Sequence, residues 1–419
     1  MSDEPGKRPF TRRTVLKGVG TVAAAGAAAA AWHAARRNST YLFLLHEAPK
    51  ESAHPSPAWR GSTVRSYRPL GNTGIVMSDI SFGGGGRIDN PDVVSRAVER
   101  GINYFDTSPD YSKTGSEQTI GKALKVVRNK VFIASKFCAA EGHLQRDTPV
   151  PDIIRAVESS LTRLQTDYLD VGIIHEVNNI ERLMAPTFHE AFDRLKEQGK
   201  VRFLGVSSHT PNLEAVMRHA VDSGRFNMLL VAHNFSNWPD LRTIFHDAKQ
   251  RGVGVIAMKT LKGAKATVLK DFADQSQAFS QAAFKWVLSN PDVSGLIVSI
   301  HNFNQIDEYL YASGKPLRDG DLALLDRYDQ LTTADYCRPG CGACLDRCPA
   351  DVPVNDVFRY AMYFENYRRE RDAMVMYATL APERNASRCV NCPAPCEAAC
   401  PFELPIHQKM LRAHRTLKV

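Results

Sequence analysis

The middle of the chain alternates short apolar runs with amphipathic stretches. Short runs rich in β-branched residues predict strands, whereas apolar positions every three or four residues predict helices that bury one face. The predicted strands lie at 78–82, 104–107, 131–136, 169–175, 201–207, 228–234, 254–258 and 296–300. Helix-like segments lie between them, for example at 93–100, 118–126, 152–164 and 277–288. The pattern therefore predicts a repeated strand–helix unit.

Eight such units in about 250 residues have the number and length of a (β/α)8 TIM barrel. A doubly wound sheet is the alternative, but no predicted strand is followed by the GxGxxG motif that binds dinucleotides in such sheets. The glycine run at 83–86 predicts a tight turn, either at the bottom of the barrel or at its active-site end. We expect an α/β barrel over residues 66–330 and a small, mainly helical domain over residues 331–419, with helices at 354–367 and 371–380.

Composition and charge exclude several classes of protein. The chain is 43% hydrophobic and 23% charged, which excludes wholesale disorder, collagen and a polytopic membrane protein. The net charge of +8 is concentrated in residues 1–37, which hold seven basic and two acidic side chains. Residues 38–336 hold 34 of each sign. Because the body of the chain is nearly neutral, we expect no nucleic-acid partner.

The N-terminal segment has the features of an export signal. Arg12 and Arg13 precede a weakly hydrophobic run over residues 19–32, and this arrangement resembles a twin-arginine signal. The alternative is a basic tail followed by an alanine-rich helix. Residues 29–31 match a cleavage site poorly, so the signal over residues 1–37 can remain as an anchor. We read 38–65 as a linker, and we expect the twin-arginine machinery to deliver the protein to the periplasm, free or membrane-anchored.

Four polar residues lie at the predicted ends of successive strands. Asp106 and Tyr111 follow the second strand, Lys136 ends the third, and His175 ends the fourth. Each alone is more often structural, but a barrel makes these positions converge. An ammonium beside a tyrosine lowers the pKa of the phenol, a carboxylate holds the ammonium, and a histidine can orient a substrate oxygen. We therefore expect these residues to form a catalytic site.

Three motifs, at 68–74, 101–111 and 116–124, resemble the aldo-keto reductase superfamily, and the similarity runs over about residues 66–312. The resemblance implies that Asp106, Tyr111, Lys136 and His175 are the catalytic tetrad of that family. Tyr111 would give or take the carbonyl proton, and His175 would position the carbonyl. It also implies a small carbonyl, alcohol or sugar substrate and a nicotinamide, NAD or NADP, as hydride carrier.

The cofactor positions implied by the resemblance depart from the family pattern. Leu230 stands where the family has a glutamine, and Met258 stands where it has a ring-stacking aromatic residue. His301 stands where the family often has a basic residue that binds a 2′-phosphate. The choice between NAD and NADP is therefore left open. The implied contacts are Ser207, Ser208, Leu230, Met258, Lys259, Leu261, Ser299, His301, Gln305 and Glu308. The cofactor could be loaded before export and stay tightly bound.

Eight of the nine cysteines lie beyond residue 336, in two runs that each end in Cys-Pro. This spacing is typical of ferredoxins with two [4Fe–4S] clusters, in which the fourth cysteine of each run ligates the other cluster. That pattern assigns Cys337, Cys341, Cys344 and Cys400 to one cluster and Cys389, Cys392, Cys396 and Cys348 to the other. Zinc and disulfides are the alternatives. Both runs carry one residue more than the usual motif.

We expect an exported oxidoreductase that passes electrons between the barrel and an external electron-transfer partner through two [4Fe–4S] clusters. One alternative is a non-catalytic barrel that serves as a scaffold for the ferredoxin-type module. Another is a cytosolic reductase whose N-terminus mimics a signal. Cys138 is expected to be a buried small hydrophobic residue rather than part of the pocket. His209 and His233 are secondary candidates for the pocket.

Overall fold

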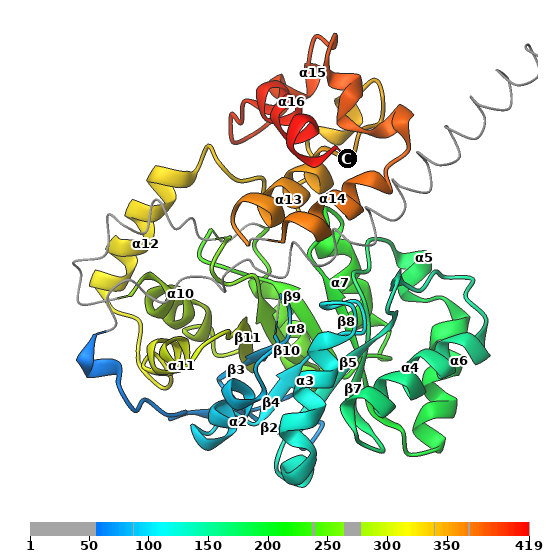
Figure 1. Cartoon of the computed structure of the whole chain (residues 1–419). Coiled ribbons are helices and arrows are strands. Elements are labelled where there is room, and N and C mark those ends of the chain that lie inside the picture. Colours follow the sequence, from blue (N-terminus) through cyan, green and yellow to red (C-terminus); the bar gives the residue numbers. More distant parts are fainter. Residues whose placement is uncertain are drawn as a thin grey trace, which may run out of the picture. The chain divides into compact units, whose positions relative to one another are not determined.

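Eight parallel strands close into a barrel (Figure 1). The computed structural model describes residues 56–418 except 87, 237–238, 264–277, 339 and 368. The barrel strands are β3 (Ile80–Gly83), β4 (Tyr104–Asp106), β5 (Phe132–Ala139), β7 (Leu169–Ile174), β8 (Val201–Ser208), β9 (Met228–Ala232), β10 (Gly254–Met258) and β11 (Gly295–Ser299). They neighbour one another in the order β4-β3-β11-β10-β9-β8-β7-β5, and a β4–β5 pairing closes the ring. The predicted TIM barrel is thus confirmed, with each strand within a few residues of its predicted position.

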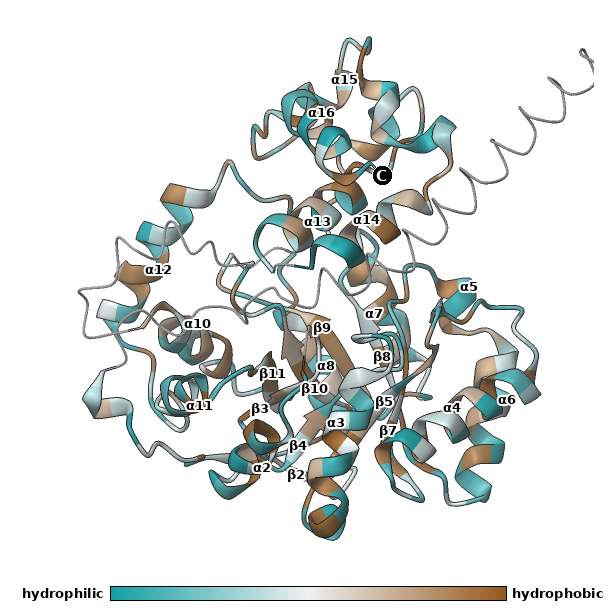
Figure 2. Ribbon diagram, in the orientation of Figure 1, coloured by the Kyte–Doolittle hydropathy of each residue, from teal (hydrophilic) through white to brown (hydrophobic). Residues whose placement is uncertain are grey.

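The helices surround the barrel and bury one face against it, as α4 illustrates. Its buried residues Ile153, Val157, Leu161 and Leu164 recur every three or four positions, and α4 and α6 carry both hydrophobic and hydrophilic residues (Figure 2). The helices of this part are α2 (Pro91–Glu99), α3 (Gly115–Leu124), α4 (Val150–Leu164), α5 (Ile180–Leu183), α6 (Pro186–Glu197), α7 (Leu213–Asp222), α8 (Arg242–Gln250), α10 (Phe279–Leu288), α11 (Phe303–Leu310) and α12 (Asp319–Thr332).

A hairpin that the sequence pattern did not predict lies at the N-terminal end of the barrel. Strands β1 (Tyr67–Pro69) and β2 (Val76–Ser78) pair antiparallel, and the hairpin contributes Leu70, Ile75 and Met77 to the apolar cluster inside the barrel. Gly71 has a φ of 52°, and a Cβ there would lie 2.2 Å from the Gly252 carbonyl oxygen. Only glycine therefore allows this close approach of the hairpin to the barrel.

Part of the expected linker is packed against the barrel. A single 3-10 turn, η2 (Pro57–Trp59), buries Trp59, and the backbone N–H of Val64 donates to the Arg100 carbonyl at 2.8 Å. The assignment of residues 56–65 to a linker is therefore corrected. This segment is held by one buried ring, Trp59, and by a capped turn. Because neither gives a repeating hydrophobic pattern, the sequence did not indicate the packing. The other residues of that expected linker, and the expected export signal, lie outside the described residues.

The C-terminal part is helical and has its own apolar core. It comprises α13 (Val354–Glu365), α14 (Glu370–Ala378), α15 (Pro395–Ala398) and α16 (Ile406–Leu417), with 3-10 turns η5 (Leu345–Arg347), η6 (Pro382–Arg384) and η7 (Ala386–Cys389). The predicted helices at 354–367 and 371–380 correspond to α13 and α14. Val357, Tyr377 and Met410 are among the buried residues of this core. Among the described residues, no helix is both long and apolar enough to span a membrane.

Candidate active site

The structure brings the four predicted strand-end residues together at the C-terminal end of the barrel. Lys136, on β5, donates from Nζ to Asp106 Oδ1 at 2.6 Å and to the Thr107 carbonyl at 2.7 Å. Asp106 ends β4, and both side chains are at most 2% exposed. Because β4 and β5 are neighbouring parallel strands, the ion pair is held by the sheet itself. Asp106 Oδ2 has no hydrogen-bond partner.

Tyr111 reaches this ion pair from the turn between β4 and α3. The turn is tight, since Ser112, Lys113 and Thr114 all have positive φ angles. The Tyr111 ring lies with its centroid 4.7 Å from Lys136 Nζ, and its edge meets the His175 ring at a centroid distance of 6.0 Å. His175 directly follows β7 and is buried. The run Gly83–Gly86 follows β3 at the same end, so it is an active-site turn and not a turn at the bottom of the barrel.

The protonation of Tyr111 differs from the expectation that Lys136 lowers its pKa. Burial raises the pKa of Tyr111 well above the ordinary value, and Asp106 and Asp110 raise it further. Lys136 lies over the ring face and gives its hydrogen bonds to Asp106 and Thr107 instead. Among the nearby cations, Arg369 of the C-terminal part lowers the pKa of Tyr111 most, but it does not offset burial. Tyr111 is therefore a phenol at neutral pH.

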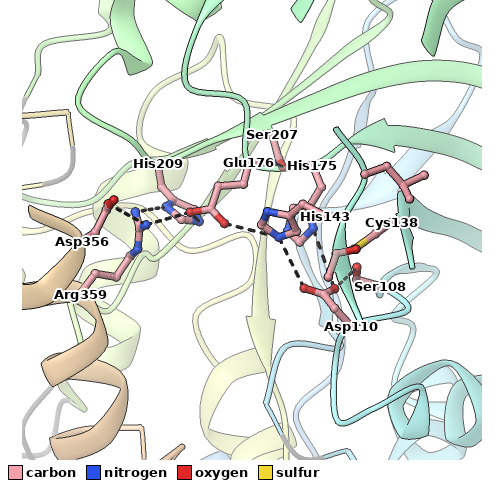
Figure 3. A network of polar contacts seen from close by, with 12 residues as sticks. Ser108, Asp110, Cys138, His143, His175, Glu176, Ser207, His209, Asp356 and Arg359 are labelled. Carbon is pink, nitrogen blue, oxygen red and sulfur yellow. Dashed lines mark hydrogen bonds and ion pairs between the residues drawn. The ribbon is translucent and has the colours of Figure 1, made fainter. Parts of the chain in front are cut away.

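His175 begins a chain of polar contacts that leads away from the tetrad (Figure 3). Its Nδ1 lies 3.9 Å from Asp110 Oδ1, and Asp110 Oδ2 lies 3.6 Å from His143 Nε2. The same His143 nitrogen is 3.5 Å from Glu176 Oε2. Burial lowers the pKa of His175 well below the ordinary value, so its ring is neutral at neutral pH. Two carboxylates thus flank His143 beside the neutral His175.

The chain of contacts ends on helix α13. Arg359 pairs with Glu176 Oε1 at 2.9 Å and with Asp356 at 2.9 Å, and its Nη1 lies 3.1 Å from His209 Nδ1 (Figure 3). Burial opposes the ionisation of Glu176, yet the positive charge of Arg359 holds its pKa well below the ordinary value. Burial lowers the pKa of His209 to about 3, so His209 is neutral. The C-terminal part therefore supplies a counter-charge to the barrel site.

Most of the residues on β8, on β9 and at the end of β10 that were expected to contact a nicotinamide make contacts within the protein instead. Ser207 Oγ accepts a hydrogen bond from the Glu176 backbone N–H at 3.0 Å, and Ser208 Oγ lies 3.3 Å from Thr210 Oγ1. Leu230 and Met258 belong to the apolar cluster inside the barrel. Leu261 packs against the helices outside.

Lys259, directly after β10, is engaged by the C-terminal part. Its Nζ donates to the Tyr363 hydroxyl at 2.7 Å and lies 4.6 Å from the centroid of that ring. The Tyr367 ring is 5.9 Å from the same Nζ. Lysine carries three donors, so donors remain free for an anion.

The last group of implied contacts surrounds the start of α11. Ser299, which ends β11, donates to the Gly85 carbonyl. The backbone N–H of His301 donates to Gln305 Oε1 at 2.7 Å, while Asn302 caps α11 by accepting from the Gln305 N–H. The Glu308 carboxylate accepts a hydrogen bond from the Ser280 hydroxyl. The edge where β11 meets this helix is the place where barrels commonly bind phosphate groups.

All nine cysteines, each within the described residues, are free thiols. Burial and the neighbouring Cys341, Cys344 and Cys400 raise the pKa of Cys337 to about 12. Burial together with Cys348, Cys392 and Cys396 raises the pKa of Cys389 to about 11. Cys337, Cys341, Cys344 and Cys400 line one small pocket, although Cys344 also neighbours Cys396. The assignment of the eight cysteines to two clusters stays a prediction.

Sequence reasoning missed the residues that surround the tetrad. Asp110 and His143 were not singled out, Cys138 was read as a packing residue, and Glu176 and Arg359 carried no motif. The spacing Cys138-x4-His143 was the available signal, because a tight hairpin brings such positions opposite each other. His233, a secondary candidate, lies away from the tetrad between the rings of Phe245 and Trp286.

Comparisons with known proteins agree on the barrel. The model of the Aldo/keto reductase family matches residues 83–277. L-galactose dehydrogenase of Arabidopsis thaliana is 28% identical over 287 residues, which cover 60% of this chain and 88% of that protein. Aldo-keto reductase AFTS1 of Alternaria alternata is 27% identical over 327 residues, again covering 60% and 88%.

Solved structures show the same fold. Aldo-keto reductase AKR11C1 from Bacillus halodurans, in its holo form, aligns with a TM-score of 0.53 and 22% identity over 62% of this chain and 95% of that chain. An aldo/keto reductase from Klebsiella pneumoniae, solved in complex with NADP and acetate, aligns with a TM-score of 0.51 and 22% identity over 62% and 94%.

Proposed function

This chain belongs to the aldo/keto reductase superfamily and is an oxidoreductase, and we propose that it interconverts a carbonyl compound and its alcohol while exchanging electrons with two [4Fe–4S] clusters. The observation that carries the proposal is the assembly of Tyr111 and His175 beside the buried Lys136–Asp106 pair. The cysteine groups of the C-terminal part supply the ligands for the clusters.

Tyr111, His175 and Lys136 each have a different role in the proton transfer. Tyr111, which is protonated at neutral pH, gives its hydroxyl proton to the carbonyl oxygen as the alcohol forms. His175 is neutral, so it orients the carbonyl by hydrogen bonding rather than by donating a full proton. Lys136 is fixed by Asp106 and Thr107 and places a positive charge beside the phenolate that remains. Solvent returns the proton to Tyr111.

A nicotinamide dinucleotide fits the edge formed by the ends of β10 and β11. The N-terminus of α11, capped by Asn302, presents backbone N–H groups to an anion, and Lys259 adds a side-chain cation. Gln305 and His301 lie at the same edge. When bound, a nicotinamide supplies or accepts hydride and two [4Fe–4S] clusters carry one electron each, which together match the two electrons of one carbonyl reduction.

The two cysteine groups fit iron–sulfur clusters better than they fit free thiols. Burial, and after it the neighbouring cysteines, raise the pKa values of Cys337 and Cys389, so their thiolates are unfavourable without a counter-charge, which a cationic cluster core supplies. Backbone N–H groups of Val352 and Ala394 already point at Cys348 Sγ and Cys392 Sγ, at 3.3 and 3.4 Å. Such hydrogen bonds to sulfur tune the potentials of clusters.

One cysteine group faces the end of the barrel. A cavity of about 140 Å³ is lined by Cys337 and Cys341 of the C-terminal part together with Arg359 and by Lys259 and His209 of the barrel. This arrangement supports electron exchange between the first cluster and the barrel. An external one-electron carrier would then exchange electrons with the second cluster.

The substrate class follows from the relatives. A methylglyoxal reductase of Yersinia pestis is 27% identical over 260 residues, and the Arabidopsis relative is named for L-galactose. We therefore propose a small aldehyde, ketone or sugar as the substrate of this chain.

Replacing Tyr111 by Phe tests the proposal. The variant keeps the ring against His175 but loses the proton donor, so turnover of small carbonyls with NADPH or NADH should fall by about 10²-fold or more. Tyr168→Phe is the matched control, because its ring stacks on Arg128 outside the site. Equal turnover in Tyr111→Phe and the parent protein would rule out the tetrad as the catalytic centre and favour the scaffold alternative.

We propose export by the twin-arginine route as the second part of the function, supported by Arg12 and Arg13. The route carries folded proteins, which suits a protein whose clusters are assembled before export. Replacing both arginines by lysine should keep the protein in the cytoplasm, as followed by cell fractionation. An unchanged location would contradict this assignment.

A further inference from the structure

Four potential metal ligands converge beside the tetrad. One ligand atom each from Asp110, Cys138, His143 and His175 lies within 4.8 Å of all the others. The four come from three elements: Asp110 from the β4–α3 turn, Cys138 and His143 from the β5–β6 hairpin, and His175 from the end of β7. Figure 3 shows their side chains pointing toward one another. The proposed reaction uses only His175 of these residues.

A short hairpin pre-organises two of the ligands. Strand β5 extends past the barrel wall and turns back as β6 (Gly142–His143), so that Cys138 and His143 are directly opposite each other in the antiparallel pair. Directly opposed residues in such a pair project from the same face. Cys138 Sγ also lies 3.0 Å from the Gly142 carbonyl oxygen, which holds the thiol at the hairpin.

The orphaned nitrogen of His175 is an independent sign of a ligand. His175 is only 6% exposed, yet its Nδ1 has no hydrogen-bond partner. The nearest acidic group is Asp110 Oδ1, at 3.9 Å, which is too far for a hydrogen bond. A buried polar atom without a partner is costly, so something other than the protein is expected to satisfy it. The ligand atoms of the other three residues lie within 4.8 Å of a His175 ring nitrogen.

We propose that Asp110, Cys138, His143 and His175 bind one divalent transition-metal ion, and that zinc suits this ligand set best. Zinc in proteins takes four ligands drawn from thiolate, imidazole and carboxylate in a tetrahedron. The thiolate and the carboxylate together neutralise the two charges of the ion, which suits a site with little exposure to water. Binding releases the proton of Cys138 to solvent.

The surroundings of the four residues suit such a site. Ser108 donates to the Asp110 carboxylate and fixes its orientation. Glu176 lies 3.5 Å from His143 Nε2 but is held by Arg359 at 2.9 Å, which leaves it as a neighbour of the site and not a fifth ligand. Oriented partners of this kind are usual behind metal ligands. The ion would also fix the His175 tautomer, because a metal on Nδ1 leaves the proton on Nε2.

The test measures metal content, so it does not depend on the proposed reaction. The full chain, purified anaerobically with its clusters and dialysed against micromolar zinc, is analysed for zinc and iron by mass spectrometry. The parent protein should hold about one zinc per chain, bound by one sulfur and three nitrogen or oxygen atoms in zinc X-ray absorption. Cys138→Ser and His143→Gln should each lower zinc at least about tenfold without lowering iron. His246→Gln, at an exposed histidine, is the matched control and should keep its zinc.

Three outcomes would overturn the proposal. The parent protein could hold no zinc, in which case the four residues form only a network of polar contacts. The zinc could be unchanged in both variants. The absorption spectrum could show four sulfur ligands, which would place the zinc on C-terminal cysteines left without iron. The absorption measurement uses the parent protein alone, so it decides the question even where a variant fails to fold.

Discussion

At the scale of the residue, histidines of similar burial have different roles because of their neighbours. His175 and His209 face carboxylates or Arg359, whereas His233 is enclosed by the aromatic rings of Phe245 and Trp286 at centroid distances of 5.0 Å. A histidine in such an apolar place is stable only when neutral. His233 is therefore part of the core, and its titration affects stability rather than chemistry.

The burial of His233 leads us to expect that the folded protein loses stability in acid. Burial lowers the pKa of His233 to about 4 from an ordinary value of 6.5, so the unfolded chain binds a proton there more readily than the folded one. The stability that the neutral ring contributes is present above pH 6.5 and is lost as the pH falls toward 4, by up to about 3 kcal/mol. In His233→Gln, the melting temperature should fall less between pH 7 and about 4.5 than in the parent. His246→Gln should follow the parent curve, and identical slopes in all three proteins would contradict the assignment.

At the scale of the element, the position of Tyr111 depends on how closely helix α3 packs against helix α4. Helix α3 begins just after the Tyr111 turn and packs on α4, where Gly121 allows a close approach. A Cβ on Gly121 would lie 2.6 Å from the Arg163 carbonyl oxygen and from Leu164 backbone atoms. Backbone cannot move aside as a side chain can, so the two helices would have to separate.

Gly121→Ala should therefore destabilise the protein by about 1–3 kcal/mol, the usual range for an overpacked core position. Gly115→Ala, in the same helix, is the matched control, since its Cβ would meet nothing closer than Ser112 Cβ at 3.5 Å. Chemical denaturation followed by circular dichroism measures both changes. Equal stability of the two variants would show that the α3–α4 contact is not as tight as the structure has it.

The long elements were predictable from the sequence, but the short ones were not. The barrel strands and helices such as α4 span enough residues for a hydrophobic period to be visible. The β1–β2 hairpin and β6 span two or three residues each, which is too few for any period. Of the candidate site, Asp106, Lys136 and His175 could be predicted because they lie in or directly after apolar strands, toward their C-terminal ends. Asp110, His143, Glu176 and Arg359 meet only through tertiary contacts between segments far apart in the sequence.

At the scale of the whole molecule, helix α13 connects the cysteine-bearing part to the catalytic end of the barrel. Arg359 on α13 pairs with Glu176, and Tyr363 on the same helix accepts a hydrogen bond from Lys259. The Gly263 carbonyl accepts from the Tyr336 hydroxyl and from Asn366. Arg359 and Glu176 are only 14% and 20% exposed, so neither charge is well solvated without the other. The two parts are therefore coupled through buried charge.

Breaking the Arg359–Glu176 ion pair should weaken the coupling between the barrel and the C-terminal part. Arg359→Met leaves Glu176 without its main counter-charge and should destabilise the protein by about 3 kcal/mol, whereas the double variant with Glu176→Gln should recover part of that loss. Arg384→Met is the control, because its pair with Asp351 is exposed. Thermal denaturation of Arg359→Met, Glu176→Gln and the double variant gives the coupling energy, and additive effects would contradict a direct pair.

The proposed function requires that carbonyl chemistry at Tyr111 draws on electrons held by two iron–sulfur clusters in the C-terminal part of the same chain. The most direct test is to reduce the anaerobic protein, remove the reductant, and add methylglyoxal or a sugar aldehyde with much less NADP than protein, so that full cluster oxidation requires carbonyl reduction. Cluster oxidation is followed by electron paramagnetic resonance. The proposed electron path predicts that the parent clusters are reoxidised with formation of alcohol. It also predicts that Tyr111→Phe, although equally reducible, is reoxidised about 10²-fold more slowly. Equal reoxidation in both proteins, or clusters that stay reduced in the parent whatever the carbonyl, would contradict it.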